Sequence, residues 1–215
     1  IFFRHLLDAR MAALTLLHAA ASGVTLYSFD SDQNKFTSRG SVGCAIGGSA
    51  ATSQYQMLCY TDGKSPICTT TIAPSNEFRY NVMQGPSYGN LTADDSSVWS
   101  VSFRSDVEAN QFAAGIGLAF WGCQGKPNTV VHYDTAPGSG AQGVAFGDHV
   151  AVRLTGWLVK DNDKGLPLLG DVCDGPKGLD KLFKFQLGQG VVCQGVETGM
   201  VGMKKDSRRV IVLPP

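Results

Sequence analysis

Glycine is the residue that most constrains how this chain can fold. The sequence contains 26 glycines among 215 residues, whereas an average protein contains roughly 7% glycine. Glycine weakens the interior of a helix and is favoured in turns and tight loops. Long helices are therefore disfavoured, and the composition predicts a mainly β protein of the α+β class.

The formal charges balance, which limits the kinds of partner. Lys and Arg number 18, as do Asp and Glu, and hydrophobic residues make up 43% of the chain. A surface that binds nucleic acid needs clustered basic side chains. The basic cluster in this sequence is short, is interpreted as a solvated turn, and consists of Lys204, Lys205, Arg208 and Arg209. We therefore expect a globular protein that binds no nucleic acid.

The cysteines do not have the spacing of a metal site. They stand at positions 44, 59, 68, 123, 173 and 193, with no C-x-x-C pair and no paired spacing to histidine, which zinc sites usually show. The chain also lacks the short motifs of P-loop enzymes, zinc proteases and serine hydrolases. We expect no metal, no cofactor and a reducing compartment.

Residues 1–22 are predicted to form an N-terminal helical segment. Apolar residues fall near one helical face, at Phe3, Leu6, Leu7, Leu14 and Leu17. Charged residues and histidines interrupt the stretch before it reaches the eighteen or so apolar residues of a membrane span, so no direct span is expected. A signal peptide over residues 11–22 is the alternative, because its apolar middle ends in small residues, although no basic start supports it.

A strand that leads directly into a capped helix organises residues 23–121. In the stretch 98–103, alternation places Trp99, Val101 and Phe103 on one face of a sheet. Ser105 and Glu108 then form a capping box, which satisfies free backbone N–H groups at a helix start. Apolar residues at steps of three and four predict one apolar face on the helix that follows. The stretch 122–127 is interpreted as a short linker between two domains.

This strand and helix resemble the end of an EVH1 (WH1) domain, on the segments Val98–Phe103 and Asn110–Gly115. The resemblance covers the whole first unit and implies a PH-like β-sandwich with a C-terminal helix. In that family, aromatic side chains form a groove that stacks on a polyproline II helix. Tyr27 and Phe36 stand in two groove positions, and Leu91 stands where a third aromatic is expected. The resemblance thus implies an incomplete groove with weak affinity, on the order of 0.1 to 1 mM. From the residues alone, Tyr27 and Phe36 are equally consistent with core or rim positions.

Residues 128–215 are predicted to form a second unit of antiparallel strands with one short helix. Apolar and polar residues alternate in the stretches 150–154 and 183–187, as in strands with one buried face. A short helix is expected at 196–203, and a strand returns from it at 210–213.

Four motifs in the second unit are similar in order and spacing to the FKBP-type prolyl isomerase domain. They are Leu154-Thr-Gly-Trp-Leu158, Phe183-Lys-Phe-Gln-Leu-Gly188, Gly195-x-x-x-Gly199 and Met203-Lys-Lys205. An EVH1-like unit followed directly by an FKBP-like unit is the order found in the WASP-and-FKBP-like protein family, which the chain resembles. The family's long loop and last strand are not reached by residue 215, so the resemblance implies an FKBP-like sheet that is truncated in this chain.

The FKBP resemblance implies an aromatic cup that speeds rotation about an X-Pro bond by stripping water from the amide. The position of the tryptophan that floors this cup falls on Val196. Losing such a ring costs about 3 to 5 kcal/mol of packing if nothing refills the space, which corresponds to a loss of more than about a hundredfold in rate or affinity. Three positions match the family, namely Asp174, Phe183 and Val192, and four depart from it, namely Leu154, Cys173, Cys193 and Val196.

Together the two resemblances predict an intracellular scaffold or adaptor that binds protein partners and has little or no prolyl isomerase activity. No residue is assigned a catalytic role. The alternatives are an active peptidyl-prolyl cis-trans isomerase and a structural subunit of a large assembly. The expected partners are proteins, either proline-rich segments or such an assembly. The expected location is the cytoplasm, with the cytoskeleton and vesicles as candidate sites of association.

Overall fold

The computed structural model describes residues 14–61, 65–75, 78–83, 87–174 and 182–214. Within these ranges the chain forms thirteen strands and two helices, so it is mainly β, as predicted. The elements of the first half are β1 (Thr15–Asp30), β2 (Lys35–Ser49), β3 (Gln54–Tyr60), β4 (Pro66–Ile72), β5 (Tyr80–Val82), β6 (Tyr88–Thr92), β7 (Val98–Ser102) and α1 (Asp106–Cys123).

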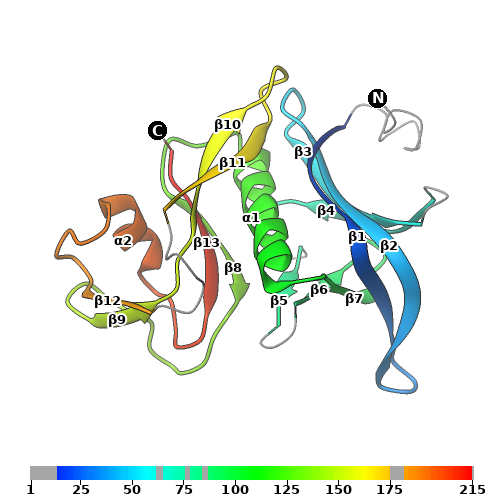
Figure 1. Cartoon of the computed structure of the whole chain (residues 1–215), viewed down its shortest axis with the longest axis horizontal. Helices are drawn as coiled ribbons and strands as arrows, with labels where there is room; N and C mark the ends of the chain where they lie inside the picture. Colours follow the sequence, from blue (N-terminus) through cyan, green and yellow to red (C-terminus); the bar gives the residue numbers. More distant parts are fainter. Residues whose placement is uncertain (1–13, 62–64, 76–77, 84–86, 175–181, 215) are drawn as a thin grey trace.

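The seven strands of the first half form one antiparallel sheet in the order β4-β3-β2-β1-β7-β6-β5. The sheet curls so that β4, at one edge, meets the end of β6 (Figure 1). Thr70 Oγ1 donates to the carbonyl oxygen of Thr92 at 2.9 Å, and the Asp94 carboxylate accepts from Thr71 N at 2.7 Å. These bonds close the curl into the PH-like plan that the EVH1 resemblance implies.

Helix α1 lies between the curled sheet and the strands of the second half (Figure 1). Ser105 caps its start, with Oγ accepting from Glu108 N at 3.2 Å. The Glu108 carboxylate accepts from Arg104 N at 3.1 Å, not from Ser105 N as a capping box predicts. The sequence predicts one apolar face, but α1 is covered on nearly all sides: its buried residues are Ala109, Phe112, Ala113, Ala114, Gly115, Ile116, Gly117, Leu118, Ala119, Trp121 and Gly122.

The N-terminal helix predicted at residues 1–22 is wrong for the part that the structure describes. Residues 15–22 belong to β1, which pairs with β2 from Thr15 onward. Residues 1–13 lie outside the described residues. Leucine and alanine favour a helix in isolation, but here Ala20 and Val24 are buried in the core of the sheet. Tertiary burial outweighs the local preference, and the first sheet starts at Thr15 rather than at the predicted residue 23.

The second half is antiparallel throughout, but it is divided into three ladders of two strands each. These ladders pair β10 with β11, β12 with β9, and β13 with β8. The predicted short helix is present as α2, and the predicted returning strand is present as β13. The bounds are β8 (Val131–Ala136), β9 (His149–Val152), β10 (Gly156–Asp161), β11 (Pro167–Asp174), β12 (Phe183–Gln186), α2 (Gln194–Met200) and β13 (Arg208–Val212).

The stretch predicted as a linker fastens the two halves together. Helix α1 runs on to Cys123, and Gly125 and Lys126 then turn the chain with φ values of 78° and 55°. Lys126 Nζ bonds the Asp161 carboxylate at 2.7 Å, and Trp121 Nε1 donates to the Pro127 carbonyl at 3.1 Å. The turn between β10 and β11 also inserts Leu166, 1% exposed, into the core of the first half.

Two glycines on α1 permit close contact on opposite sides. A Cβ added to Gly115 would lie 2.9 Å from the Ile46 side chain and 3.2 Å from that of His18, on the side of the curled sheet. A Cβ added to Gly117 would lie 2.4 Å from the Val210 side chain of β13. Larger residues would force the layers apart, because real side chains almost never approach so closely.

Among the described residues, no helix combines the length and the apolar character needed to cross a membrane.

The stability of this fold is expected to fall as the pH is lowered from 7.5 to 5.5. Desolvation by burial lowers the pKa of His18, against a smaller opposing effect of Glu108. Burial and the nearby Arg209 likewise lower the pKa of His132. The unfolded chain then binds protons near pH 6.5 that the folded chain binds only at lower pH, so the free energy of unfolding decreases through this window.

Urea denaturation at a series of pH values measures this dependence. His18→Gln should reduce the slope of the free energy of unfolding against pH, whereas His149→Gln, on the exposed surface of β9, controls for the substitution itself. An equal slope in the wild type and in His18→Gln would contradict the assignment.

Candidate functional site

Two tyrosines meet on the outer face of the curled sheet. Tyr27 on β1 and Tyr88 on β6 bring their ring centroids to 6.0 Å. On β1, the neighbouring Leu26 is fully buried on the core side, so Tyr27 points away from α1. The hydrogen bond between the two hydroxyls, together with weaker desolvation, raises the pKa of Tyr27. The pair therefore forms a half-exposed aromatic surface.

A second aromatic pair continues this face along the β1–β2 hairpin. Phe29 on β1 lies directly opposite Phe36 on β2, with ring centroids 5.1 Å apart. The two side chains are 36% and 41% exposed. Phe29 is two residues from Tyr27, so both point to the same side of the strand. Phe36, which the EVH1 resemblance assigns to the groove, therefore shares a surface with Tyr27.

Small, uncharged side chains separate these aromatics. Ser100 on β7 lies between Tyr27 on β1 and Asn90 on β6 in the strand register, and Ser102 lies opposite Tyr88. Ser38 of β2 pairs with Tyr27 on its other side. Because serine is short, the two tyrosine rings can lean together across β7. The result is a surface with amide and hydroxyl groups beside exposed rings.

Leu91 does not belong to this surface. It is 2% exposed and packs in the core on the opposite face of β6. Tyr88, which the sequence reasoning missed, is the residue of β6 that stands beside Tyr27. Alternation along Tyr88–Thr92 could have revealed it, because Gly89 and Leu91 are buried whereas Tyr88 and Asn90 are not. Tyr88 thus places a third aromatic side chain on the surface that carries Tyr27 and Phe36.

The positions assigned to the FKBP pocket are spread over β11, β12, α2 and the segment after β9. Phe183 on β12 is 41% exposed and contacts Phe185 at 5.2 Å between ring centroids. Cys173 on β11 and Cys193, which precedes α2, are exposed. Leu154 is half-buried. The side chain of Asp174 lies outside the described residues.

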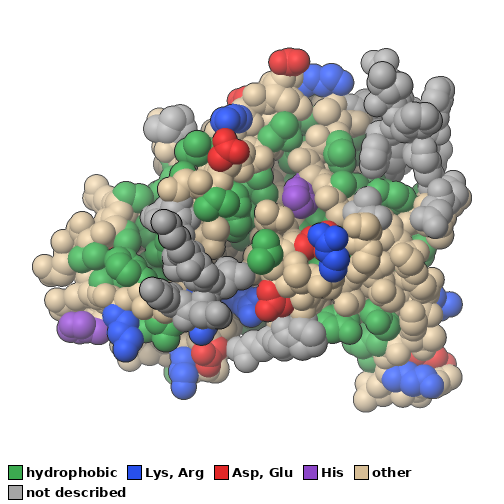
Figure 2. Space-filling view, viewed as in Figure 1, with side chains coloured by type: hydrophobic (Ala, Val, Ile, Leu, Met, Phe, Trp, Pro, Cys, Tyr) green, Lys and Arg blue, Asp and Glu red, His purple; other side chains and the backbone are tan. Residues whose placement is uncertain are grey.

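Val192 and Val196 pack instead against a small apolar core formed by Phe185, Leu187 and Met200. Hydrophobic side chains also gather on the surface over α2, β9 and β12 (Figure 2). They are exposed by between 41% and 59% at Phe146, Leu182, Phe183 and Val191. In the part of the chain that the structure describes, these four exposed side chains therefore lie on an open surface.

The second half has a shallow hollow, and its lining differs from the residues that the resemblance assigns to the FKBP pocket. Its lining consists of Phe146, Gly147, Leu187, Gly188, Gln189, Gly190, Gln194 and Glu197. Glu197 is 4% exposed, and its Oε1 accepts from the backbone N–H groups of Gly188 and Gly190 at 3.0 and 3.1 Å. This carboxylate orders the loop between β12 and α2, because it satisfies two backbone donors there.

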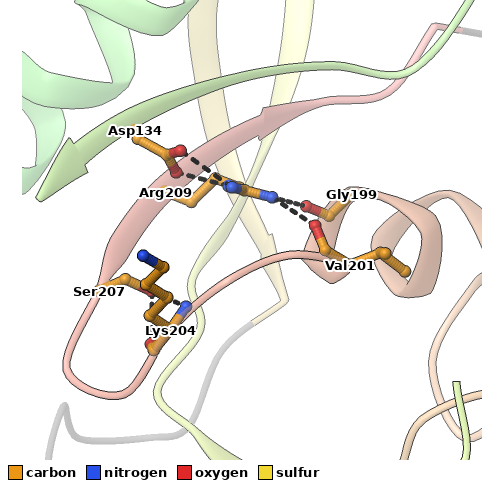
Figure 3. Close-up of polar contacts among 6 residues, drawn as sticks. All are labelled: Asp134, Gly199, Val201, Lys204, Ser207 and Arg209. Carbon is orange, nitrogen blue, oxygen red and sulfur yellow. Dashed lines mark hydrogen bonds and ion pairs between the residues drawn. The ribbon is translucent and has the colours of Figure 1, made fainter. Parts of the chain in front are cut away.

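Arg209 anchors α2 to the β8–β13 ladder (Figure 3). Its side chain is 6% exposed and forms a bidentate ion pair with the Asp134 carboxylate. Nε donates to Oδ1, and Nη2 donates to Oδ2 at 2.9 Å. Nη1 donates to the carbonyl oxygens of Gly199 and Val201 at 2.8 and 2.9 Å, where α2 ends. One guanidinium thereby pairs a carboxylate and caps a helix C-terminus.

The cysteines are free thiols. Cys44, Cys59 and Cys68 stand side by side on β2, β3 and β4 in the core. The hydrogen bond with Cys44 and burial raise the pKa of Cys59 well above its ordinary value, which keeps the thiol protonated. Within the described ranges, no cluster of three or more His, Cys, Asp or Glu side chains is arranged to hold a metal ion.

Residues 140–215 match the FKBP-type peptidyl-prolyl cis-trans isomerase family. The whole chain also has relatives among FKBP proteins. It is 31% identical over 191 residues to FK506-binding protein 5 of Dictyostelium discoideum, covering 89% of this chain and 11% of the relative. It is 30% identical over 208 residues to human FK506-binding protein 15, covering 96% of this chain and 16% of the relative. The chain thus spans only a small part of these relatives, and both alignments extend over both of its halves.

Solved structures resemble about half of the chain at low sequence identity. The Ran-binding domain of the nuclear complex component Nup2 from Ashbya gossypii has a TM-score of 0.43 at 14% identity, covering 52% of this chain and 98% of that one. The EVH1 domain of Dm DCP1, solved in complex with the XRN1 DBM peptide, has a TM-score of 0.38 at 14% identity, covering 48% and 75%.

Arg209→Met is expected to destabilise the chain by about 2 kcal/mol, because it leaves the Asp134 carboxylate and the end of α2 without their partner. Urea denaturation would measure the loss. Arg208→Met, at the neighbouring position, is the control and should change the free energy of unfolding by less than about 0.5 kcal/mol. Equal effects of the two substitutions would show that the contacts of Arg209 contribute no special stability.

Proposed function

We propose that this chain is part of a protein-binding adaptor whose first half binds proline-rich segments in the polyproline II conformation. The observation that carries the proposal is the aromatic surface of Tyr27, Tyr88 and Phe36 on the outer face of the curled sheet. A polyproline II helix has flat proline faces and loses little entropy on binding, so half-exposed aromatic rings suit it.

The lining of the groove supports an uncharged ligand. Asn90 and Ser102 lie among the tyrosines and are half-exposed, and their amide and hydroxyl groups suit the peptide carbonyls, which have no partner within a polyproline II helix. Aromatic contacts contribute about 0.5 to 1.5 kcal/mol each beyond the area they bury. With Tyr88 as the third aromatic, the affinity should be tighter than the incomplete groove implied, at a Kd on the order of 0.1 mM or below.

The FKBP-type segment is proposed to serve this adaptor as a protein-binding module with little isomerase activity. Leu154, Cys173 and Val196 stand at three positions where the family resemblance implies large aromatic side chains. The exposure of Phe183, Cys173 and Cys193 supports an open surface in place of a dry cup. Such a surface removes water from a bound amide poorly, and desolvation is what the reaction needs.

The finer relationship is also a proposal. The sequence resembles the WASP-and-FKBP-like family in the order of its two units. Alignments to FK506-binding proteins 5 and 15 that cover both halves support this order. A cytoplasmic adaptor associated with the cytoskeleton or with vesicles is consistent with the free thiols of the chain.

An octaproline peptide titrated into the chain should shift amide NMR signals around Tyr27, Tyr88 and Phe36. Tyr88→Ala and Phe36→Ala should each weaken binding about fivefold, the effect of losing one aromatic contact. Phe146→Ala removes an exposed aromatic outside the groove and serves as the control. The absence of shifts at millimolar peptide would refute the proposed groove.

The full-length protein should catalyse prolyl isomerisation at least about a hundredfold more slowly than an ordinary FKBP, because the floor of the pocket has lost its ring. A protease-coupled assay on a proline peptide measures the rate. As a companion, Leu154→Tyr combined with Val196→Trp should raise the affinity for macrolide ligands of the FKBP pocket. A near-normal rate in the wild type would contradict the proposal and favour an active isomerase.

A further inference from the structure

The open edge of the curled sheet, at β5, is hydrogen-bonded by a tyrosine side chain from the second half. Strand β5 stands at the edge of the sheet and pairs only with β6. On its open side, the Tyr133 hydroxyl of β8 accepts from Tyr80 N at 2.8 Å and donates to the Tyr80 carbonyl oxygen at 3.2 Å. Both backbone groups of Tyr80 are thus satisfied as a neighbouring strand would satisfy them.

Tyr133 is itself held firmly. Its ring contacts Phe78 at 5.6 Å and Phe120 of α1 at 5.2 Å between centroids. Burial raises the pKa of Tyr133 to about 12, so the hydroxyl keeps its proton at neutral pH and remains a donor. The ring contacts would survive removal of the hydroxyl, which makes the hydrogen bonds separately testable.

Strand β5 in turn positions the strand that carries Tyr88. Val82 pairs with Gly89, and Met83 N donates to the Tyr88 carbonyl at 2.9 Å. The Tyr80 ring lies directly over Gly89, where an added Cβ would come within 2.4 Å of the Tyr80 hydroxyl oxygen. A shift of β5 would therefore move β6 and change how Tyr88 meets Tyr27.

We propose that Tyr133 is a positioning residue for the aromatic groove, through which the second half of the chain sets the contact between Tyr88 and Tyr27. This inference rests on the proposed function for its ligand, a proline-rich segment. The coupling is reciprocal: a ligand that requires the present tyrosine geometry also strengthens the contact between Tyr133 and β5. The FKBP-type half then acts on the groove without touching the ligand.

The test compares Tyr133→Phe with Asp161→Asn in the whole chain. Tyr133→Phe removes only the hydroxyl, whereas Asp161→Asn breaks a different contact between the halves, the ion pair with Lys126. Tyr133→Phe should weaken octaproline binding about fivefold and speed hydrogen exchange at the Tyr80 amide by a similar factor. It should also bring the Tyr27 pKa, which the Tyr88 hydroxyl raises, back toward 10. Asp161→Asn should change none of the three.

The outcomes separate this inference from the proposed function. If the wild type binds octaproline and Tyr133→Phe binds it as tightly, with an unchanged Tyr27 pKa, the positioning role is overturned. If the wild type binds no octaproline but Tyr133→Phe still lowers the Tyr27 pKa, the positioning role is supported and the proposed function fails. If Asp161→Asn has the same effects as Tyr133→Phe, any loosening between the halves suffices and Tyr133 has no specific role.

Discussion

The close packing of α1 on two sides is the constraint on which the rest of the structure depends. Gly115 lets the helix approach His18 and Ile46 of the curled sheet, and Gly117 lets it approach Val210 of β13. A helix that is apolar on nearly all sides must be buried on all of them, so neither half can bury α1 alone. The two halves are therefore layers around one helix, and stability in one is tied to stability in the other.

This arrangement decides which face of the curled sheet is covered. The core side of the curled sheet is filled by α1, so the half-exposed aromatic side chains stand on its outer face. There the register of β1, β7 and β6 brings Tyr27 and Tyr88 together over short serines. The second half contributes to the edge of the same sheet, where the Tyr133 hydroxyl bonds both backbone groups of Tyr80.

The two halves differ in what they retain. The first presents two aromatic pairs, Tyr27 with Tyr88 and Phe29 with Phe36, on one surface. The second matches the FKBP-type family over residues 140–215, and the resemblance places Leu154 and Val196 where that family has large rings. Its best-anchored feature is structural: Arg209 ties α2 to Asp134. The described part of the chain thus presents aromatic side chains on the outer face of the first half and a tightly bonded arginine in the second.

Alternation and capping signals in the sequence alone predicted four features: the strand before Phe103, the helix start at Ser105, the short helix α2 and the strand β13. Each signal depends on residues only a few positions apart in the chain. Three features were decided only by the tertiary structure. Residues 15–22 form a strand despite their helical preference, because pairing with β2 and burial of Ala20 outweigh it. Tyr88 of β6 meets Tyr27 of β1 across β7, because alternation tells which side chains share a face but not which strands become neighbours. Tyr133 bonds a strand 53 residues away, and no local pattern can encode a partner that only the packing of α1 brings within reach.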